Sequence, residues 1–372
     1  MINACRGAVS LLLQGALVAL TASILTAAQA ASSQPSTQER LKRVSAELFT
    51  RADPDAIKEL KDILASDPGS ADAHMLLGIA YRSLGGQELL GEAVAELRQA
   101  IAINPRLAQA RMYLAHVYLD LGRPARARQE LEAALAQAPG HPPFLALMGE
   151  TERQMNNPTR ALELLRQAIA ADASFAQARY YLALALLDIG QRDEAIKALE
   201  QVVASGAKVA DVYVSLGAAY IVAGRIDDAL ETLSQGSWID PSRADIRIAL
   251  ARAYRIKGAF AKAQEQLAAA TPQPSVTALS QQLEFEYYTE LGLLRLARNQ
   301  LASAAEALRK VLDMDPGHGL TNRYLAEVYL KQGSLAKARE HAALADKQGA
   351  PLPESLRKLL QMKTPATTGP RK

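Results

Sequence analysis

The sequence predicts an all-helical protein built as a stack of similar helix–turn–helix units. Most of this prediction depends on one pattern, a large residue followed by glycine or alanine that recurs along most of the chain. The small residues of these pairs are Gly78, Ala115, Gly149, Ala183, Gly217, Ala251, Gly292 and Ala326. Five of the seven steps between them equal 34 residues. A fixed period of this length is typical of solenoids, in which each unit packs on its neighbours instead of around one central core.

The first helix of five of the eight units is indicated by a tyrosine three positions after the small residue, as at Tyr118 and Tyr220. The small residue lets a neighbouring helix approach closely, and the tyrosine covers the space beside it. A glycine such as Gly224 then ends the helix, because a residue without Cβ adopts the left-handed cap conformation most easily.

The second helix of each unit is indicated by an alanine, an apolar residue four positions later and a small or apolar residue three positions after that. Ala161, Leu165 and Ala168 show the pattern, and these spacings place all three on one helical face. The helix often stops at an acid or amide before proline, as at Asp240-Pro241, because proline disfavours helical geometry in the preceding residue.

This set of positions resembles the tetratricopeptide repeat (TPR) family over residues 71–350, about eight units. The resemblance implies a right-handed superhelix with the first helices on its concave face, and a role in binding protein partners. The tryptophan common early in the family's first helix is absent, and comparable positions hold His74, Leu145, Tyr213 and Tyr288.

The predicted domain organisation places an array of repeats between two capping regions. Residues 31–70 predict a linker and a degenerate capping helix pair, residues 351–362 a C-terminal capping helix, and residues 363–372 a disordered tail. Extra residues around 271–284 include two prolines and lengthen one step of the repeat. They indicate either an extended turn between repeats or a joint between two sub-arrays.

Residues 1–30 predict a secretory signal peptide. Arg6 precedes an uncharged apolar stretch from Ala8 to Leu25, and small residues flank a cleavage position after Ala30. We therefore expect export to a bacterial periplasm. The alternative is that the apolar stretch stays uncleaved and anchors the protein in the inner membrane, facing the periplasm. The only cysteine, Cys5, lies in this segment, so cleavage would leave no thiol for a disulfide or a metal site.

Composition and motifs give no sign of catalysis or of nucleic-acid binding. Lys and Arg number 42 against 39 Asp and Glu, and this balance gives no reason to expect a nucleic-acid partner. The five histidines are scattered without zinc-ligand spacing, and no phosphate-binding loop or nucleophile elbow is present. We therefore expect no catalytic residue, no metal site and no cofactor.

The repeat register places a candidate binding groove on the concave face of the first helices. Its side chains are mostly apolar in the middle and more charged toward the C-terminus. The set comprises Met75, Ile79, Met112, His116, Leu119, Tyr180, Leu184, Leu187, Val214, Ile221, Ile248, Arg252, Arg255 and Arg323. An exposed apolar stripe favours binding of an amphipathic helix or an extended segment of a protein partner. The alternative for any single residue is that it packs between neighbouring first helices.

The sequence thus predicts a non-catalytic scaffold or adaptor of the bacterial cell envelope. Similar exported TPR proteins serve polysaccharide export, surface-protein sorting and pilus assembly, and the sequence does not choose among them. Co-chaperone members of the family grip a carboxylate with lysine and asparagine. Comparable positions here hold Met75, Ile79, Met112 and His116. We therefore do not expect this protein to grip a carboxylate in that way. The alternative function is a membrane-anchored assembly subunit with an uncleaved N-terminal helix.

Overall fold

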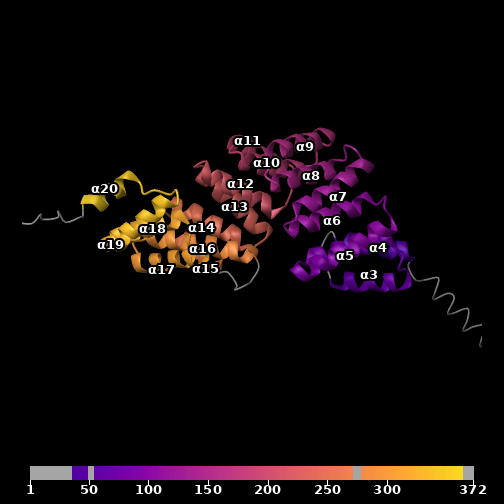
Figure 1. Cartoon of the computed structure of the whole chain (residues 1–372), viewed down its shortest axis with the longest axis horizontal. Coiled ribbons are helices and arrows are strands. Elements are labelled where there is room, and N and C mark those ends of the chain that lie inside the picture. The colour runs from indigo at the N-terminus through magenta and orange to yellow at the C-terminus, as the bar shows by residue number, and fades with distance from the viewer. Residues whose placement is uncertain (1–35, 49–53, 271–277, 363–372) are drawn as a thin grey trace, which may run out of the picture. The chain divides into compact units, whose positions relative to one another are not determined.

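The computed structural model describes residues 36–48, 54–270 and 278–362 (Figure 1). All secondary structure in these residues is α-helical, as expected for a solenoid of helix–turn–helix repeats. The predicted fold class is therefore confirmed for the described residues. The chain divides into two compact units, one ending at Ala173 and the other beginning at Ser174.

The first unit contains eight of the described helices, and the last six of them form three repeats. They are α2 (Thr37–Leu48), α3 (Pro54–Ser66), α4 (Ala71–Leu84), α5 (Gln87–Ile103), α6 (Ala108–Asp120), α7 (Pro124–Gln137), α8 (Pro142–Gln154) and α9 (Pro158–Ala171). Each repeat pairs two consecutive helices, α4 with α5, α6 with α7, and α8 with α9. The second helix of one repeat also packs on the first helix of the next, which makes the unit a continuous stack.

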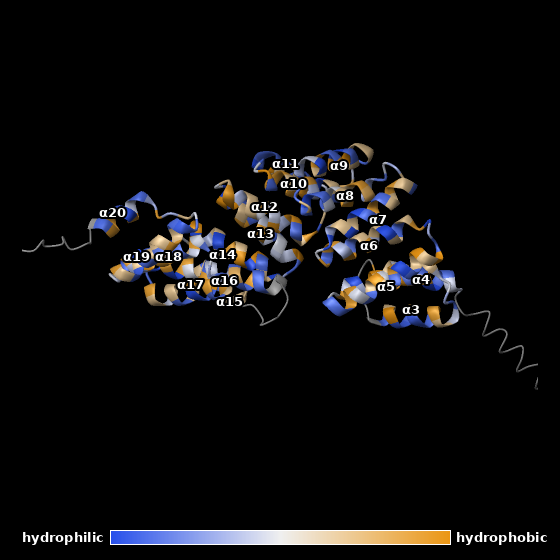
Figure 2. Ribbon diagram, viewed as in Figure 1, coloured by the Kyte–Doolittle hydropathy of each residue, from blue (hydrophilic) through white to orange (hydrophobic). Residues whose placement is uncertain are grey.

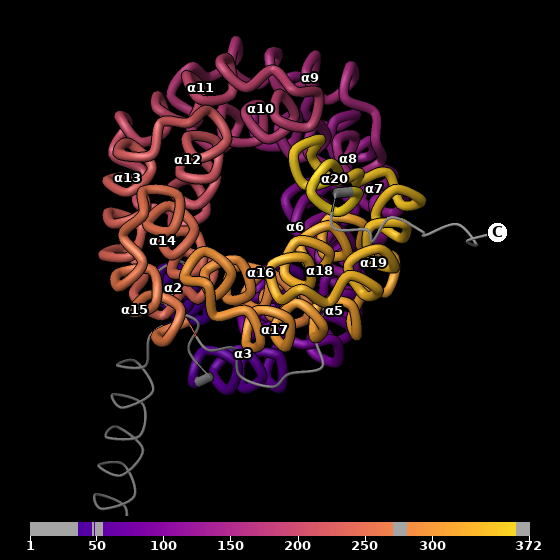
Figure 3. The backbone as a smooth tube through the Cα atoms, turned by 90° about the vertical axis from the view of Figure 1, so that its left-hand side faces the viewer, coloured from indigo at the N-terminus to yellow at the C-terminus, as the bar shows by residue number. Residues whose placement is uncertain are grey.

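The second unit continues the same pattern with five helix pairs and one further helix. Its described helices are α10 (Ala176–Asp188), α11 (Arg192–Ala204), α12 (Ala210–Val222), α13 (Ile226–Ile239), α14 (Ala244–Ile256), α15 (Phe260–Ala269), α16 (Ala278–Ala297), α17 (Leu301–Met314), α18 (Gly319–Lys331), α19 (Leu335–Lys347) and α20 (Glu354–Met362). Figure 3 shows α10, α12, α14 and α16 on the inner side of this unit's curve, and α11, α13, α15 and α17 on its outer side.

The two helices of a repeat cross at the small residues that define the period. A Cβ added to Gly217 would lie 2.4 Å from Cγ of Leu233, and one added to Gly149 would lie 2.6 Å from Cγ of Leu165. A separation below about 3 Å between carbon atoms is far inside van der Waals contact. The predicted close approach is therefore confirmed, and the partner at each crossing is a leucine of the second helix.

The turn after each first helix requires a residue in the left-handed region. Gly122, Gly190 and Gly224 have φ values of 66°, 77° and 76°, as the glycine pattern predicts. In the repeats of α8 and α16 the same place is held by Asn156 and Asn299, with φ values of 60° and 58°. Asparagine is one of the few residues with a Cβ that adopts this conformation readily, so the turn keeps its geometry without glycine.

The polar and apolar faces of the helices follow the repeat. Figure 2 shows apolar and hydrophilic residues alternating along the helices of both units. Fully buried leucines of the second helices, such as Leu131, Leu165 and Leu199, form the centre of each repeat. No helix in the described part of the chain combines the length and the apolar character that crossing a membrane would need.

Several sequence predictions concern segments at the ends and at the break in the period. The signal peptide over 1–30 and the tail over 363–372 lie outside the described residues, as do residues 271–277. After this break, α16 has 20 residues, whereas the preceding first helix, α14, has 13. The division between the two compact units falls after Ala173, and the choice between an extended turn and a joint at 271–284 stays open.

Candidate functional site

The inner helices of the first unit enclose an apolar hollow of about 270 Å³. Met75 and Ile79 come from α4, Met112 from α6, and Phe144 from α8. The remaining lining residues are Ser45, Leu76, Gln109, Tyr113, His141 and Pro143. The structure therefore brings together three residues that the repeat register placed in the groove, from two successive first helices.

Two ionisable groups at or beside this hollow, His116 and Tyr113, have pKa values shifted toward their neutral forms. Burial, aided by the charge of Arg82, lowers the pKa of His116 to about 3, so this imidazole carries no charge at neutral pH. Burial raises the pKa of Tyr113, although Arg82 opposes the shift. Arg82 itself pairs with Asp120 at 2.5 Å between Nε and Oδ2. The hollow thus offers large, uncharged side chains, which suits an apolar group of a ligand.

A second hollow of mixed polar and apolar lining extends onto α2, which the sequence had assigned only to a capping role. It has a volume of about 470 Å³ and lies between α2 and α4, lined by Leu41, Lys42 and Ala46 on one side and by Met75 on the other. Because Met75 lines both hollows, the two share a wall. Phe144 and Leu41 were missed by sequence reasoning because the repeat register was applied only to positions near the small residue.

The inner helices α10 and α12 of the second unit carry a half-buried apolar stripe. Tyr180, Leu184 and Leu187 of α10 are partly exposed, as are Val214 and Ile221 of α12. In the same way Leu119 of α6 is partly exposed in the first unit. These side chains present apolar surface to solvent.

Further along the second unit, two predicted groove arginines bind a buried carboxylate. Nε of Arg252 lies 2.7 Å from Oε1 of Glu290, and Nε of Arg255 lies 2.9 Å from Oε2 of the same residue. The Glu290 side chain, on α16, is only 4% exposed. The arginines therefore connect α14 to α16, and sequence reasoning missed Glu290 because it stands outside the repeat's defining positions.

Two other predicted groove residues, Ile248 and Arg323, do not belong to the half-buried apolar stripe. Ile248 is fully buried, in a core cluster that includes Leu267 and Leu291, so its side chain is not accessible to a partner. The reason is that α16 packs on α14 and covers this position. The guanidinium of Arg323 lies 5.1 Å from the ring centroid of Tyr324, its neighbour on α18.

In the part of the chain that the structure describes, no three His, Cys, Asp or Glu side chains are placed to hold a metal ion together.

The stacked helix pairs, the glycine crossings and the apolar inner faces define a helical-repeat protein. Three models of the tetratricopeptide repeat family match residues 86–150, 125–265 and 289–353. These matches together span more than half of the chain, and the chain belongs to the TPR family. The repeats of this family form a scaffold for protein–protein interaction. None of the curated protein sequences matches the chain significantly.

Solved structures share the fold at low sequence identity. One is the APC/C heterotetramer Cut9–Hcn1, with 16% identity, a TM-score of 0.65, and coverage of 84% of this chain and 60% of that chain. The type IV pilus biogenesis factor PilW has 17% identity, a TM-score of 0.48 and coverage of 57% and 97%. YrrB, described as a TPR protein with an unusual peptide-binding site, has 20% identity, a TM-score of 0.35 and coverage of 56% and 100%. The first likeness supports the fold and nothing further.

Proposed function

We propose that this protein is a non-catalytic scaffold that captures a segment of a protein partner on the inner faces of its repeats. The observation that carries the proposal is the uncharged hollow of about 270 Å³ between α4, α6 and α8. A hollow lined by methionine and aromatic side chains suits an apolar anchor residue of a partner, because methionine adapts its shape to different ligands.

The partner segment would be an amphipathic helix or an extended peptide with a bulky apolar residue. The half-buried stripe of Tyr180, Leu184 and Leu187 offers further apolar surface in the second unit. Recognition of this kind uses a few anchors at regular spacing along the bound segment. The buried pairing of Arg252 and Arg255 with Glu290 argues against a second role for these arginines in holding an acidic partner.

The cellular location belongs to the proposal as well. An apolar stretch followed by small residues favours export to the periplasm, with cleavage after Ala30. The alternative is an inner-membrane anchor that keeps this stretch. The mass of the N-terminal peptide from native envelopes separates the two, because cleavage makes Ala31 the first residue. Within the envelope, the candidate pathways are polysaccharide export, surface-protein sorting and pilus assembly.

The proposal is tested by a crosslinked pull-down of the tagged protein from its native envelope. The groove variant carries Met112→Asp and Leu184→Asp, and the matched control carries Gln129→Asp and Gln201→Asp on exposed sites of second helices. We expect a partner that is recovered with the wild type and the control and is lost with the groove variant. Equal recovery with all three proteins would contradict capture on the inner faces, provided that thermal melts show the groove variant to be folded.

A further inference from the structure

The third repeat of the first unit lacks the tyrosine that marks the two repeats before it. Tyr118, Tyr220 and Tyr329 stand three residues after the small residue of their first helix, and they are 1%, 6% and 6% exposed. In α8 the same place is held by Glu152. In α10 it is held by Leu186, which is 4% exposed and keeps the site apolar. In α16 the place is held by Arg295, so α8 is the one first helix between α4 and α18 with a carboxylate there.

Two of these tyrosines are covered by a cation from the second helix of their own repeat, whereas Tyr220 is covered by Arg225, which precedes that helix. Arg126 lies 5.9 Å from the ring centroid of Tyr118, and Lys337 lies 5.5 Å from that of Tyr329. Each of these two cations stands eight residues after its tyrosine. Arg160 stands eight residues after Glu152, so this repeat has the cation without the ring. Cations attract aromatic faces at such distances.

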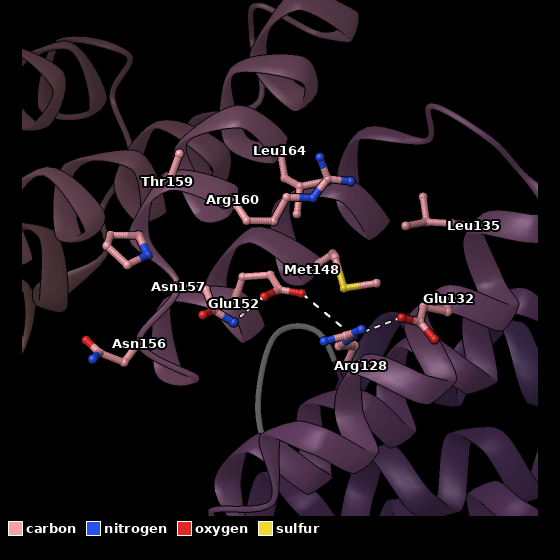
Figure 4. Close-up of a pocket in the computed structure, with 11 residues that line it drawn as sticks. Arg128, Glu132, Leu135, Met148, Glu152, Asn156, Asn157, Thr159, Arg160 and Leu164 are labelled. Carbon is pink, nitrogen blue, oxygen red and sulfur yellow. Dashed lines mark hydrogen bonds and ion pairs between the residues drawn. The ribbon is translucent and has the colours of Figure 1, made fainter.

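A hollow of about 750 Å³ lies beside Glu152, between α7, α8 and α9 (Figure 4). Its size lies within the range of ligand-binding pockets in proteins. Leu135, Met148 and Leu164 supply apolar walls. The polar lining residues are Arg128, Glu132, Glu152, Asn156, Asn157, Thr159 and Arg160. None of these residues lines the hollow of α4, α6 and α8, so the two sites are separate.

The charged side chains of this hollow already have partners. Arg160 pairs with Glu163, which does not line the hollow, at 2.8 Å, and the other pairs lie within it. The Glu152 side chain is 9% exposed, accepts a hydrogen bond from Nδ2 of Asn157 at 2.9 Å, and lies 3.8 Å from Nε of Arg128. Arg128 also donates to Glu132 at 2.9 Å. A cationic or anionic ligand would compete with these pairs, whereas an uncharged ring leaves them intact. A ring also stacks favourably on a guanidinium.

Another repeat of the protein shows how a tyrosine is held in such surroundings. The hydroxyl of Tyr220 donates to Oε1 of Glu200 at 2.6 Å, and the guanidinium of Arg225 lies 4.2 Å from the centroid of its ring. Glu200 precedes Tyr220 by 20 residues, and Glu132 precedes Glu152 by the same interval. A tyrosine ring seated in the hollow would therefore meet a carboxylate where Tyr220 meets Glu200.

We propose that the hollow of α7, α8 and α9 is a binding site for a tyrosine side chain of a partner protein. The ring would pack on Met148 and Leu164 beneath the guanidinium of Arg160, and the phenol hydroxyl would donate a hydrogen bond to Glu132. The incoming tyrosine thus replaces, from another molecule, the residue that this repeat lacks. The site is independent of partner capture on the inner faces.

The test uses three soluble probes that differ only in their side chain. N-acetyl-L-tyrosinamide, N-acetyl-L-phenylalaninamide and N-acetyl-L-lysinamide are titrated into the purified ¹⁵N-labelled full chain, and NMR follows the amides of Asn156 and Asn157. We expect saturable shifts with the tyrosine probe and a dissociation constant on the order of 1 mM, typical of so small a ligand. The phenylalanine probe should bind several-fold more weakly, because it leaves Glu132 without its donor, and the lysine probe should not saturate.

Two variants and one control locate the binding. Glu152→Tyr restores the internal ring and should abolish binding of the tyrosine probe. Arg160→Ala, at a side chain that is 57% exposed and tolerant of change, should weaken binding by about 2- to 5-fold. Arg126→Ala removes the equivalent cation over Tyr118 and should leave binding unchanged. The proposal is overturned by no saturable shift with the tyrosine probe, by tighter binding of the lysine probe, or by undiminished binding in folded Glu152→Tyr.

Discussion

The inner faces of the two units use the same repeat for different purposes. In the first unit, Met75 and Met112 line an uncharged hollow. In the second unit, Arg252 and Arg255 stand on comparable inner helices and bind the buried carboxylate of Glu290. The repeat register therefore determines where a side chain lies on its helix. The neighbouring helix determines whether that side chain is open to a partner or held in an ion pair.

Removing the buried carboxylate should give the largest loss of stability. Glu290→Ala leaves Arg252 and Arg255 without their partner, and breaking a buried ion pair in this way costs about 3 kcal/mol or more. Circular dichroism melts should therefore show a clear fall in stability. Trp238 is 77% exposed, so its fluorescence is a poor substitute for this measurement. The control is Glu354→Ala, which breaks only an exposed pair with Lys358 and should cost less than about 1 kcal/mol. Equal losses would mean that Glu290 does not hold α14 to α16.

Overpacking a helix crossing should destabilise the second unit by a smaller amount. Gly217→Leu places a side chain where even a Cβ would lie 2.4 Å from Leu233, and we expect a loss of about 1–3 kcal/mol. The same change at exposed Gln201 should stay within about 0.5 kcal/mol. Both are measured by chemical denaturation, and similar effects at the two positions would show the crossing to be misplaced.

The stability of the first unit should fall in acid because His116 becomes protonated on unfolding. Burial holds the pKa of His116 at about 3 in the folded protein, below its ordinary value of 6.5. The unfolded chain therefore binds more protons between these values, so this stabilisation is present above pH 6.5 and is lost as the pH falls toward 3. Melts between pH 7 and pH 4 should show a shallower decline for His116→Gln than for the wild type. Parallel curves would indicate that the imidazole is not buried.

The smallest effect on stability should come from Tyr220 of the second unit, at alkaline pH. Burial and the hydrogen bond to Glu200 raise the pKa of Tyr220 to about 12, from an ordinary value of 10. The folded protein therefore holds this proton more tightly, and the stabilisation is present below pH 10 and is lost as the pH rises toward 12. Tyr220→Phe should flatten this part of the stability profile. An unchanged slope in melts between pH 9 and pH 11 would contradict the phenol–carboxylate contact.

The fold was predictable because its signals are local and repeated. Gly217 marks a helix crossing and Gly224 a left-handed turn, and both functions follow from spacing alone. Asn156 takes the same turn conformation without the glycine signal. The inner face was less predictable, because the burial of Ile248 depends on the packing of α16 after a break in the period. Glu152 and its hollow depart from the repeat, so a search for shared positions passes over them.

Partner capture in the apolar hollow of the first unit is tested most directly by photo-crosslinking in living cells. A benzophenone amino acid is placed at Met112, which lines the hollow, or at Gln129, an exposed residue of α7. We predict a discrete crosslinked adduct with a partner protein at position 112, weakened by Met75→Asp in the same chain, and none at position 129. Adducts of equal strength at both positions, or none at position 112, would contradict capture on the inner face.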